Sequence, residues 1–112
     1  MSSETRRITF THEELIQAMA RQRRDEKKPL PESRIRGARA APGKDNGEPR
    51  VAVVLQTLAG DGQEEIELRP AEVAAALIKF CHLKKIPLPR RASKSIGVDR
   101  GYVSLVLQLA EH

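Results

Sequence analysis

The C-terminal segment of the chain has an aliphatic residue at every second position, and this spacing constrains the fold more than any other feature. These residues are Val103, Leu105, Leu107 and Leu109. Successive side chains of a β-strand point to opposite faces of a sheet, so a period of two buries all four on one face. Upstream, Ile96 and Val98 alternate around a glycine, and residues 99–101 are typical of a hairpin loop. We therefore expect a strand or hairpin over residues 95–109.

The same segment also resembles the turn and recognition helix of helix-turn-helix DNA-binding proteins. The residues that match the offsets of this motif are Ser93, Ile96, Gly97, Val98, Val103 and Val106. This alternative makes residues 90–107 the reader of a DNA-binding regulator, with Arg100 facing the bases. A helix, however, leaves Leu105 and Leu109 on its outer side, whereas a strand buries both, so we favour the strand.

The composition limits the chain to one small domain with an aliphatic core. It has 112 residues, a formal charge of +5, and only three aromatic residues, namely Phe10, Phe80 and Tyr102. A core this small is often supplemented by self-association. The basic charge suits a polyanion such as nucleic acid, although it also keeps a small protein soluble. The single cysteine, the polar N-terminus and the absence of a long apolar run predict a cytoplasmic protein without a membrane span.

Residues 1–28 are expected to form a tail with a short helix over residues 11–24. Thr11 and Glu14 have the spacing of a capping box, and Phe10, Leu15 and Met19 are the main apolar residues around it. These three side chains are candidates for docking a protein partner. Residues 29–50 are rich in Pro, Gly and Arg and poor in large apolar residues, which predicts a mobile linker.

Residues 51–112 are expected to form the folded unit. A hairpin over residues 51–69 turns at residues 60–62, and a helix over residues 70–85 opens at Pro70. The aliphatic arm at 51–58 is a candidate neighbour for the strand at 103–109. The predicted fold is therefore α+β, a small antiparallel sheet preceded by an N-terminal helix and a mobile linker. No internal repeat is evident along the chain.

Enzymatic chemistry has little support in the sequence. Cys81 lies on the apolar stripe of the 70–85 helix, and a lone cysteine there is typically a buried hydrophobic residue. Its neighbour His82 points to a different helix face. The chain contains no metal-ligand spacing and no glycine-rich phosphate loop, so neither a metal nor a cofactor is expected.

Basic residues are the remaining candidates for a binding site, and they form two groups. The C-terminal group is Lys84, Lys85, Arg90, Arg91 and Lys94. The N-terminal group is Arg21, Arg23, Arg24, Lys27, Lys28, Arg34, Arg36 and Arg39. The sequence thus predicts a small, non-enzymatic binding module that contacts the phosphates of a nucleic acid. The alternative is an adaptor that forms a homodimer through its sheet and docks a protein partner with its N-terminal helix.

Overall fold

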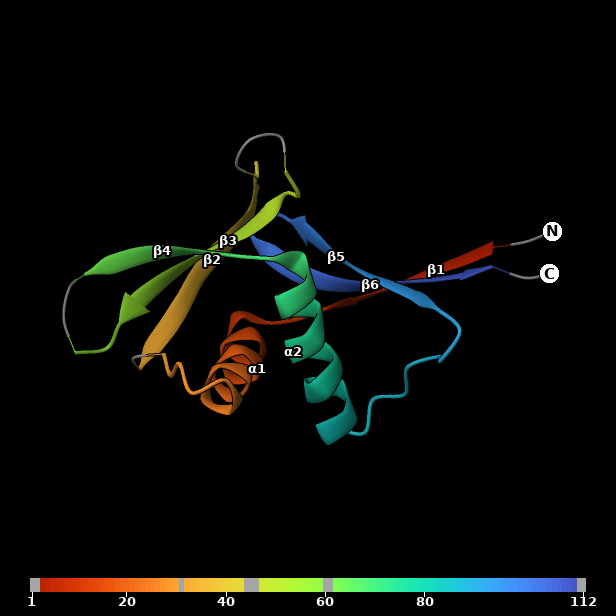
Figure 1. The fold of residues 1–112 in the computed structure, drawn as a ribbon, viewed down its shortest axis with the longest axis horizontal. Helices are drawn as coiled ribbons and strands as arrows, with labels where there is room; N and C mark the ends of the chain where they lie inside the picture. Colours follow the sequence, from red (N-terminus) through yellow and green to blue (C-terminus); the bar gives the residue numbers. More distant parts are fainter. Residues whose placement is uncertain (1–2, 31, 44–46, 60–61, 111–112) are drawn as a thin grey trace.

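The computed structural model describes residues 3–30, 32–43, 47–59 and 62–110. Their elements follow in the order β1 (Ser3–Thr9), α1 (His12–Asp25), β2 (Ser33–Ala41), β3 (Arg50–Thr57), β4 (Gln63–Leu68), α2 (Pro70–Leu83), β5 (Ser93–Asp99) and β6 (Tyr102–Ala110). The strands form two antiparallel sheets, ordered β1-β6-β5 and β2-β3-β4. Figure 1 shows the sheets spreading to either side, with both helices beneath them. Neither helix is long and apolar enough to cross a membrane, and the described residues contain no other helix.

The prediction of one small sheet preceded by an N-terminal helix and a mobile linker is wrong, although its α+β class agrees with the structure. The chain begins with β1, which pairs with β6 near the other end of the chain. The predicted linker contains β2, which pairs with β3. The strands at 51–58 and 103–109 lie in different sheets. Long-range pairing holds the short, polar strand β1, so its local sequence carries little signal.

Residues 93–110 form a β-hairpin, so the helix-turn-helix alternative for this segment is wrong. Arg100 and Gly101 have φ angles of 53° and 83°, the positive values that a type I′ turn requires. Leu105 and Leu107 are fully buried, as the period of two predicts. For the other hairpin, β3–β4, the expected turn includes residues 60 and 61, which lie outside the described residues.

The chain consists of two equivalent halves, β1-α1-β2-β3 and β4-α2-β5-β6. Within each half the third strand pairs with the second, and the first strand crosses to pair with the third strand of the other half. The registers agree as well, because Ile8 pairs with Leu105 where Ile66 pairs with Val53. The halves are therefore related by a pseudo-two-fold axis, and each completes the sheet of the other.

The sequence contains the corresponding repeat, so the expectation of no internal repeat is wrong. Strands β3 and β6 share the pattern Val-x-x-Val-Leu-Gln, at residues 51–56 and 103–108. Pro-Leu-Pro follows each helix, at residues 29–31 and 87–89. Both signals are short, and the helices between them have diverged in polarity.

One core and a hydrogen-bonded corner join the halves. Phe10 from the first half meets Phe80 of α2 edge to face, with ring centroids 6.0 Å apart. The Gly101 carbonyl at the hairpin tip accepts hydrogen bonds from the Ala38 N–H of β2, at 3.1 Å, and from His12 Nε2 of α1, at 2.9 Å. The hairpin tip thus fixes the angle at which the two sheets meet.

Candidate nucleic-acid interface

Helix α1 starts at a capping box, which sets the faces that it buries and exposes. The Glu14 N–H donates to Thr11 Oγ1 at 3.1 Å, and the Thr11 N–H donates to the Glu14 carboxylate at 2.9 Å. The proposed docking residues Phe10, Leu15 and Met19 are all buried in the core. A partner would have to open the core to reach them, so they do not form a surface.

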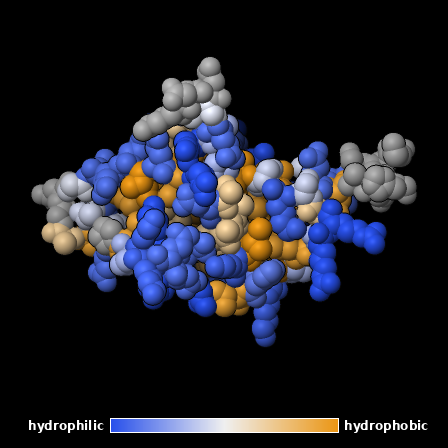
Figure 2. Space-filling view, in the orientation of Figure 1, coloured by the Kyte–Doolittle hydropathy of each residue, from blue (hydrophilic) through white to orange (hydrophobic). Residues whose placement is uncertain are grey.

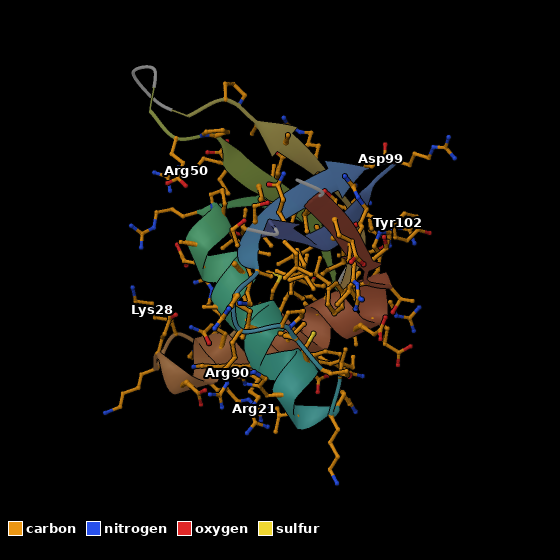
Figure 3. All side chains as sticks on the ribbon, turned by 90° about the vertical axis from the view of Figure 1, so that its right-hand side faces the viewer. Arg21, Lys28, Arg50, Arg90, Asp99 and Tyr102 are labelled. Carbon is orange, nitrogen blue, oxygen red and sulfur yellow. The ribbon has the colours of Figure 1, made fainter. Side chains whose placement is uncertain are left out.

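The opposite face of α1 is polar and basic. Gln17, Arg21 and Arg24 follow one another at spacings of four and three residues, which places them on one helix face, and all three are exposed. Lys28 continues this basic run just beyond the helix. Figure 3 shows Arg21 and Lys28 in the part of the molecule that carries the helices, away from Asp99.

Three shallow hollows adjoin one another along this face, because Gln17 lines all of them. The first, of about 560 Å³, lies between α1 and β2 and includes Arg34. The second, of about 410 Å³, includes Arg24 and the apolar residue Leu30. The third, of about 350 Å³, lies between α1 and the end of α2. We call the three together the α1 furrow.

The third hollow combines an apolar floor with basic walls. Phe80 and the half-exposed Leu83 of α2 supply the apolar surface, and Arg21, Arg24 and Lys84 surround it. The Lys84 ammonium lies 5.7 Å from the centroid of the Phe80 ring, so the ring face holds it beside the hollow. Within the described residues, none of these three cations forms a salt bridge. Their charge is therefore free to meet an external anion.

Both helices end in a way that adds lysines to this part of the molecule. Lys27 and Lys85 have φ angles of 60° and 59°, the left-handed conformation that closes a Schellman motif. The Lys28 N–H donates to the Arg23 carbonyl, and the Ile86 N–H donates to the Cys81 carbonyl, each at 2.8 Å. These cations also complement the partial negative charge of the helix ends.

The structure separates the residues of the predicted C-terminal group. Lys84 lines the furrow, whereas Lys85, Arg90 and Arg91 lie exposed around the segment that connects α2 to β5. Lys94 is half-buried, and its ammonium donates to the backbone carbonyls of residues 89 and 92, at 3.4 and 3.2 Å. It therefore braces this connecting segment from within.

The three predicted arginines of β2 are separated as well. Arg34 lines the α1 furrow, and the exposed Arg36 does not. Arg39 donates to the Glu65 carboxylate of β4, at 2.6 Å from Nη2 and 3.3 Å from Nε. The hydrogen bond to Glu65 raises the pKa of Arg39, and the carboxylate offsets its charge. Arg39 is thus committed to a contact within sheet β2-β3-β4.

Arg21 and Arg24 were predicted in the N-terminal tail with its short helix, without a connection to Lys84. Gln17 and Leu83 were not predicted as site residues. The spacing of Gln17, Arg21 and Arg24 was the available signal, because it puts a polar stripe on one side of a helix. Their proximity to the end of α2 depends on the packing of the two helices and has no local signature.

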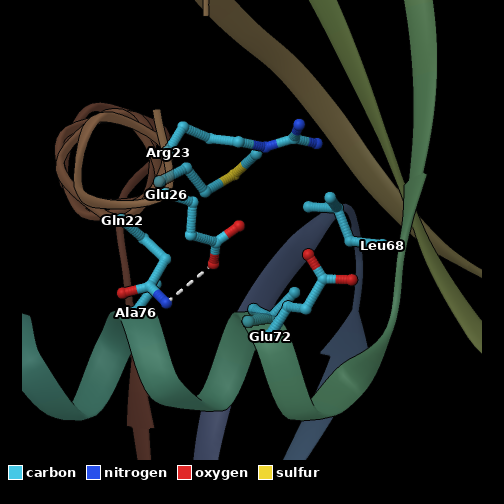
Figure 4. A pocket seen from close by; sticks show the side chains of 8 residues that line it. Gln22, Arg23, Glu26, Leu68, Glu72 and Ala76 are labelled. Carbon is cyan, nitrogen blue, oxygen red and sulfur yellow. Dashed lines mark hydrogen bonds between the residues drawn. The ribbon is translucent and has the colours of Figure 1, made fainter. Parts of the chain in front are cut away.

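A further pocket, between α1 and the start of α2, is too small for a substrate. It is lined by Gln22, Arg23 and Glu26 from one side and by Leu68, Glu72 and Ala76 from the other, as Figure 4 shows. Gln22 Nε2 donates to Glu26 at 3.0 Å, which closes part of the space. The remaining cavity, about 20 Å³, holds roughly one water molecule.

The cysteine lies in an environment unsuited to nucleophilic chemistry. Cys81 is fully buried, and this burial raises the pKa of its thiol, with a smaller contribution from Glu14. The neutral thiol is a poor nucleophile. Across the residues that the structure describes, no group of three or more His, Cys, Asp or Glu side chains is arranged to hold a metal ion.

Comparisons with protein-family models, with curated proteins and with solved structures find no significant match for this chain.

Proposed function

We propose that this protein is a non-enzymatic module that binds a nucleic acid through its phosphate backbone, along the α1 furrow. The observation that carries the proposal is the convergence of Arg21 and Arg24 with Lys84, which are far apart in the sequence, on one hollow. None of the three forms a salt bridge among the described residues, so their full charge can neutralise phosphates and release the counterions of the nucleic acid.

Acidic residues limit where phosphates bind along the furrow. Glu13 lines the first hollow beside Arg34, and Glu32 lines the second. The third hollow contains no acidic residue in its lining. Phosphate contacts are therefore strongest between Arg21, Arg24 and Lys84, and the neighbouring apolar surface accommodates sugars or unpaired bases.

A salt series with matched variants tests this proposal. Fluorescence anisotropy measures the affinity of labelled duplex DNA and RNA for the wild type, for R21Q/R24Q and for the control R36Q/R39Q. Both variants remove two arginines, but only the first pair lines the basic hollow. Each lost phosphate contact lowers the slope of log K against log salt by about 0.9 for duplex DNA, so R21Q/R24Q lowers it by about 1.8.

The control pair R36Q/R39Q keeps both the affinity and the slope of the wild type. Absence of wild-type binding at low salt excludes the function itself. If both variants lose the same affinity, the protein still binds nucleic acid, but through its net charge. That result would exclude the α1 furrow as the binding site.

A further inference from the structure

Strand β5 is the edge strand with the least protection against pairing with another chain. The edge strands are β1 and β5 in one sheet and β2 and β4 in the other. Charged residues protect two of them: Glu4, Arg6 and Arg7 in β1, and Glu64, Glu65 and Glu67 in β4. A β-bulge between Ile35 and Gly37 interrupts β2. The centre of β5, residues 95–98, has no charge, no proline and no bulge.

The free edge of β5 presents the backbone groups of Lys94, Ile96 and Val98. Asp99 and Tyr102 flank a two-residue turn and so form a hydrogen-bonded pair, and such pairs alternate along an antiparallel ladder. The backbone groups of Asp99, Gly97, Ser95 and Ser93 therefore bond to β6. The backbone N–H and C=O groups of the residues between them point away from β6, toward the free edge. The bonding of β6 agrees, because its Val103 carbonyl accepts from Phe10, on the side of β1, at 3.0 Å.

The equivalent edge in the other half is occupied. Ala38 of β2 lies opposite Val53, and Ile96 of β5 lies opposite Leu105, so Ala38 and Ile96 hold the same place in the two halves. The Ala38 N–H donates to the Gly101 carbonyl. Among the described residues, no backbone group accepts from the Ile96 N–H. The pseudo-symmetry thus leaves one of two matched edges unpaired.

Helix α2, which contacts β5, has an exposed apolar face that α1 lacks. It packs on β5 and leaves Ala71, Ala75 and Ile78 wholly or partly exposed. The residues of α1 that correspond to Ala71 and Ala75 are Glu13 and Gln17. Figure 2 shows apolar side chains gathered along α2 and toward β5, with hydrophilic surface around them. The same helix face is therefore polar in one half and apolar in the other.

We propose that two copies of this chain associate through β5 and α2 across a two-fold axis. Antiparallel pairing centred on Ile96 uses all the outward backbone groups and places Lys94 of one copy opposite Val98 of the other. Parallel pairing in register would instead place Lys94 beside Lys94 and Asp99 beside Asp99 of the second copy, so that like charges meet. Since α2 packs on the edge strand, the two α2 helices then meet, and their alanines allow close approach.

Sedimentation equilibrium over a range of protein concentrations tests the association, using the wild type, A71E/A75E and the control A59E/Q63E. All four substituted residues are wholly or partly exposed, and both variants add two negative charges. We expect a dimer for the wild type and the control. Desolvating the new carboxylates at the α2 contact weakens the dimer of A71E/A75E by roughly 100-fold or more. Circular dichroism checks that each variant folds.

Amide hydrogen exchange then identifies the strand that pairs. The amides of Lys94, Ile96 and Val98 gain protection as the protein concentration rises, whereas those of Ser95 and Gly97, which bond to β6, are protected throughout. A wild type that stays monomeric at millimolar concentration overturns the proposal. A dimer in which these three amides exchange as fast as in the monomer, or which A71E/A75E leaves intact, overturns it equally.

Discussion

Replacing Phe10 by alanine tests whether the N-terminal segment is part of the core. Phe10 is 2% exposed and packs edge to face on Phe80. Truncating a buried Phe to Ala typically costs about 3–5 kcal/mol, from lost transfer energy and the cavity left behind. At about 2.1 cal/mol/K per residue, a chain of this length loses about 4 °C in Tm for each kcal/mol. The expected loss in Tm is therefore about 13–21 °C.

Urea unfolding followed by circular dichroism gives the free energy, and thermal melts give Tm. Leu58→Ala is the matched control, because Leu58 is 54% exposed and its truncation should change stability by less than about 0.5 kcal/mol. If the free energies of unfolding of Phe10→Ala and the wild type differ by no more than this control, the segment before α1 is not packed against the second half, and the two-half architecture fails.

Three further substitutions test local features, all by urea unfolding. Gly101→Ala should lower the free energy of unfolding by about 1 kcal/mol, because its φ of +83° strains a residue with a Cβ. The control Gly62→Ala, at an open position without positive φ, should be neutral or slightly stabilising. Equal effects of the two substitutions would contradict the turn geometry. Thr11→Ala should cost about 1 kcal/mol through loss of the capping box, and an unchanged stability would count against it. Because the pKa of Cys81 is raised in the folded protein, its thiol ionises at a lower pH in the unfolded chain, so stability should fall as the pH rises through the thiol range. Cys81→Ala should remove this part of the pH dependence. A variant that keeps it would show that Cys81 is not its source.

The sequence predicted the elements whose own periodicity sets their burial. The aliphatic residues at 103, 105 and 107 fill one face of β6, and Pro70 stands at the start of α2. Both signals are local, because a strand has a period of two and a proline fits the first turn of a helix.

Strand β2 was mistaken for a linker because its apolar residues break the period of two. Ile35 and Ala38 both face the core, three positions apart, since the β-bulge between Ile35 and Gly37 inserts an extra residue. Arg34, Arg36 and Arg39 occupy exposed positions around them, which gives the composition of a mobile segment. Only the pairing with β3 reveals the strand.

The furrow was missed for a similar reason. Arg21 and Lys84 are far apart in the sequence, and the packing of α1 against α2 brings them to one hollow. The basic residues can be recognised from the sequence. Which of them form salt bridges or hydrogen bonds within the molecule, and which do not, depends on the fold. Arg39 forms an ion pair with Glu65 of another strand. Lys94 is held by the carbonyls of residues 89 and 92, which the conformation of the connecting segment brings to its ammonium.

The most direct test of the proposed function is to map the contact surface by nuclear magnetic resonance. Backbone amide shifts of the labelled protein are followed while a short duplex is added at low salt. The α1 furrow predicts perturbations concentrated at Gln17–Lys28 and around Leu83 and Lys84, which disappear as salt rises. Perturbations confined to β4, to the part of β2 beyond Ile35 or to the connecting segment at 86–92, or none at all, would contradict it.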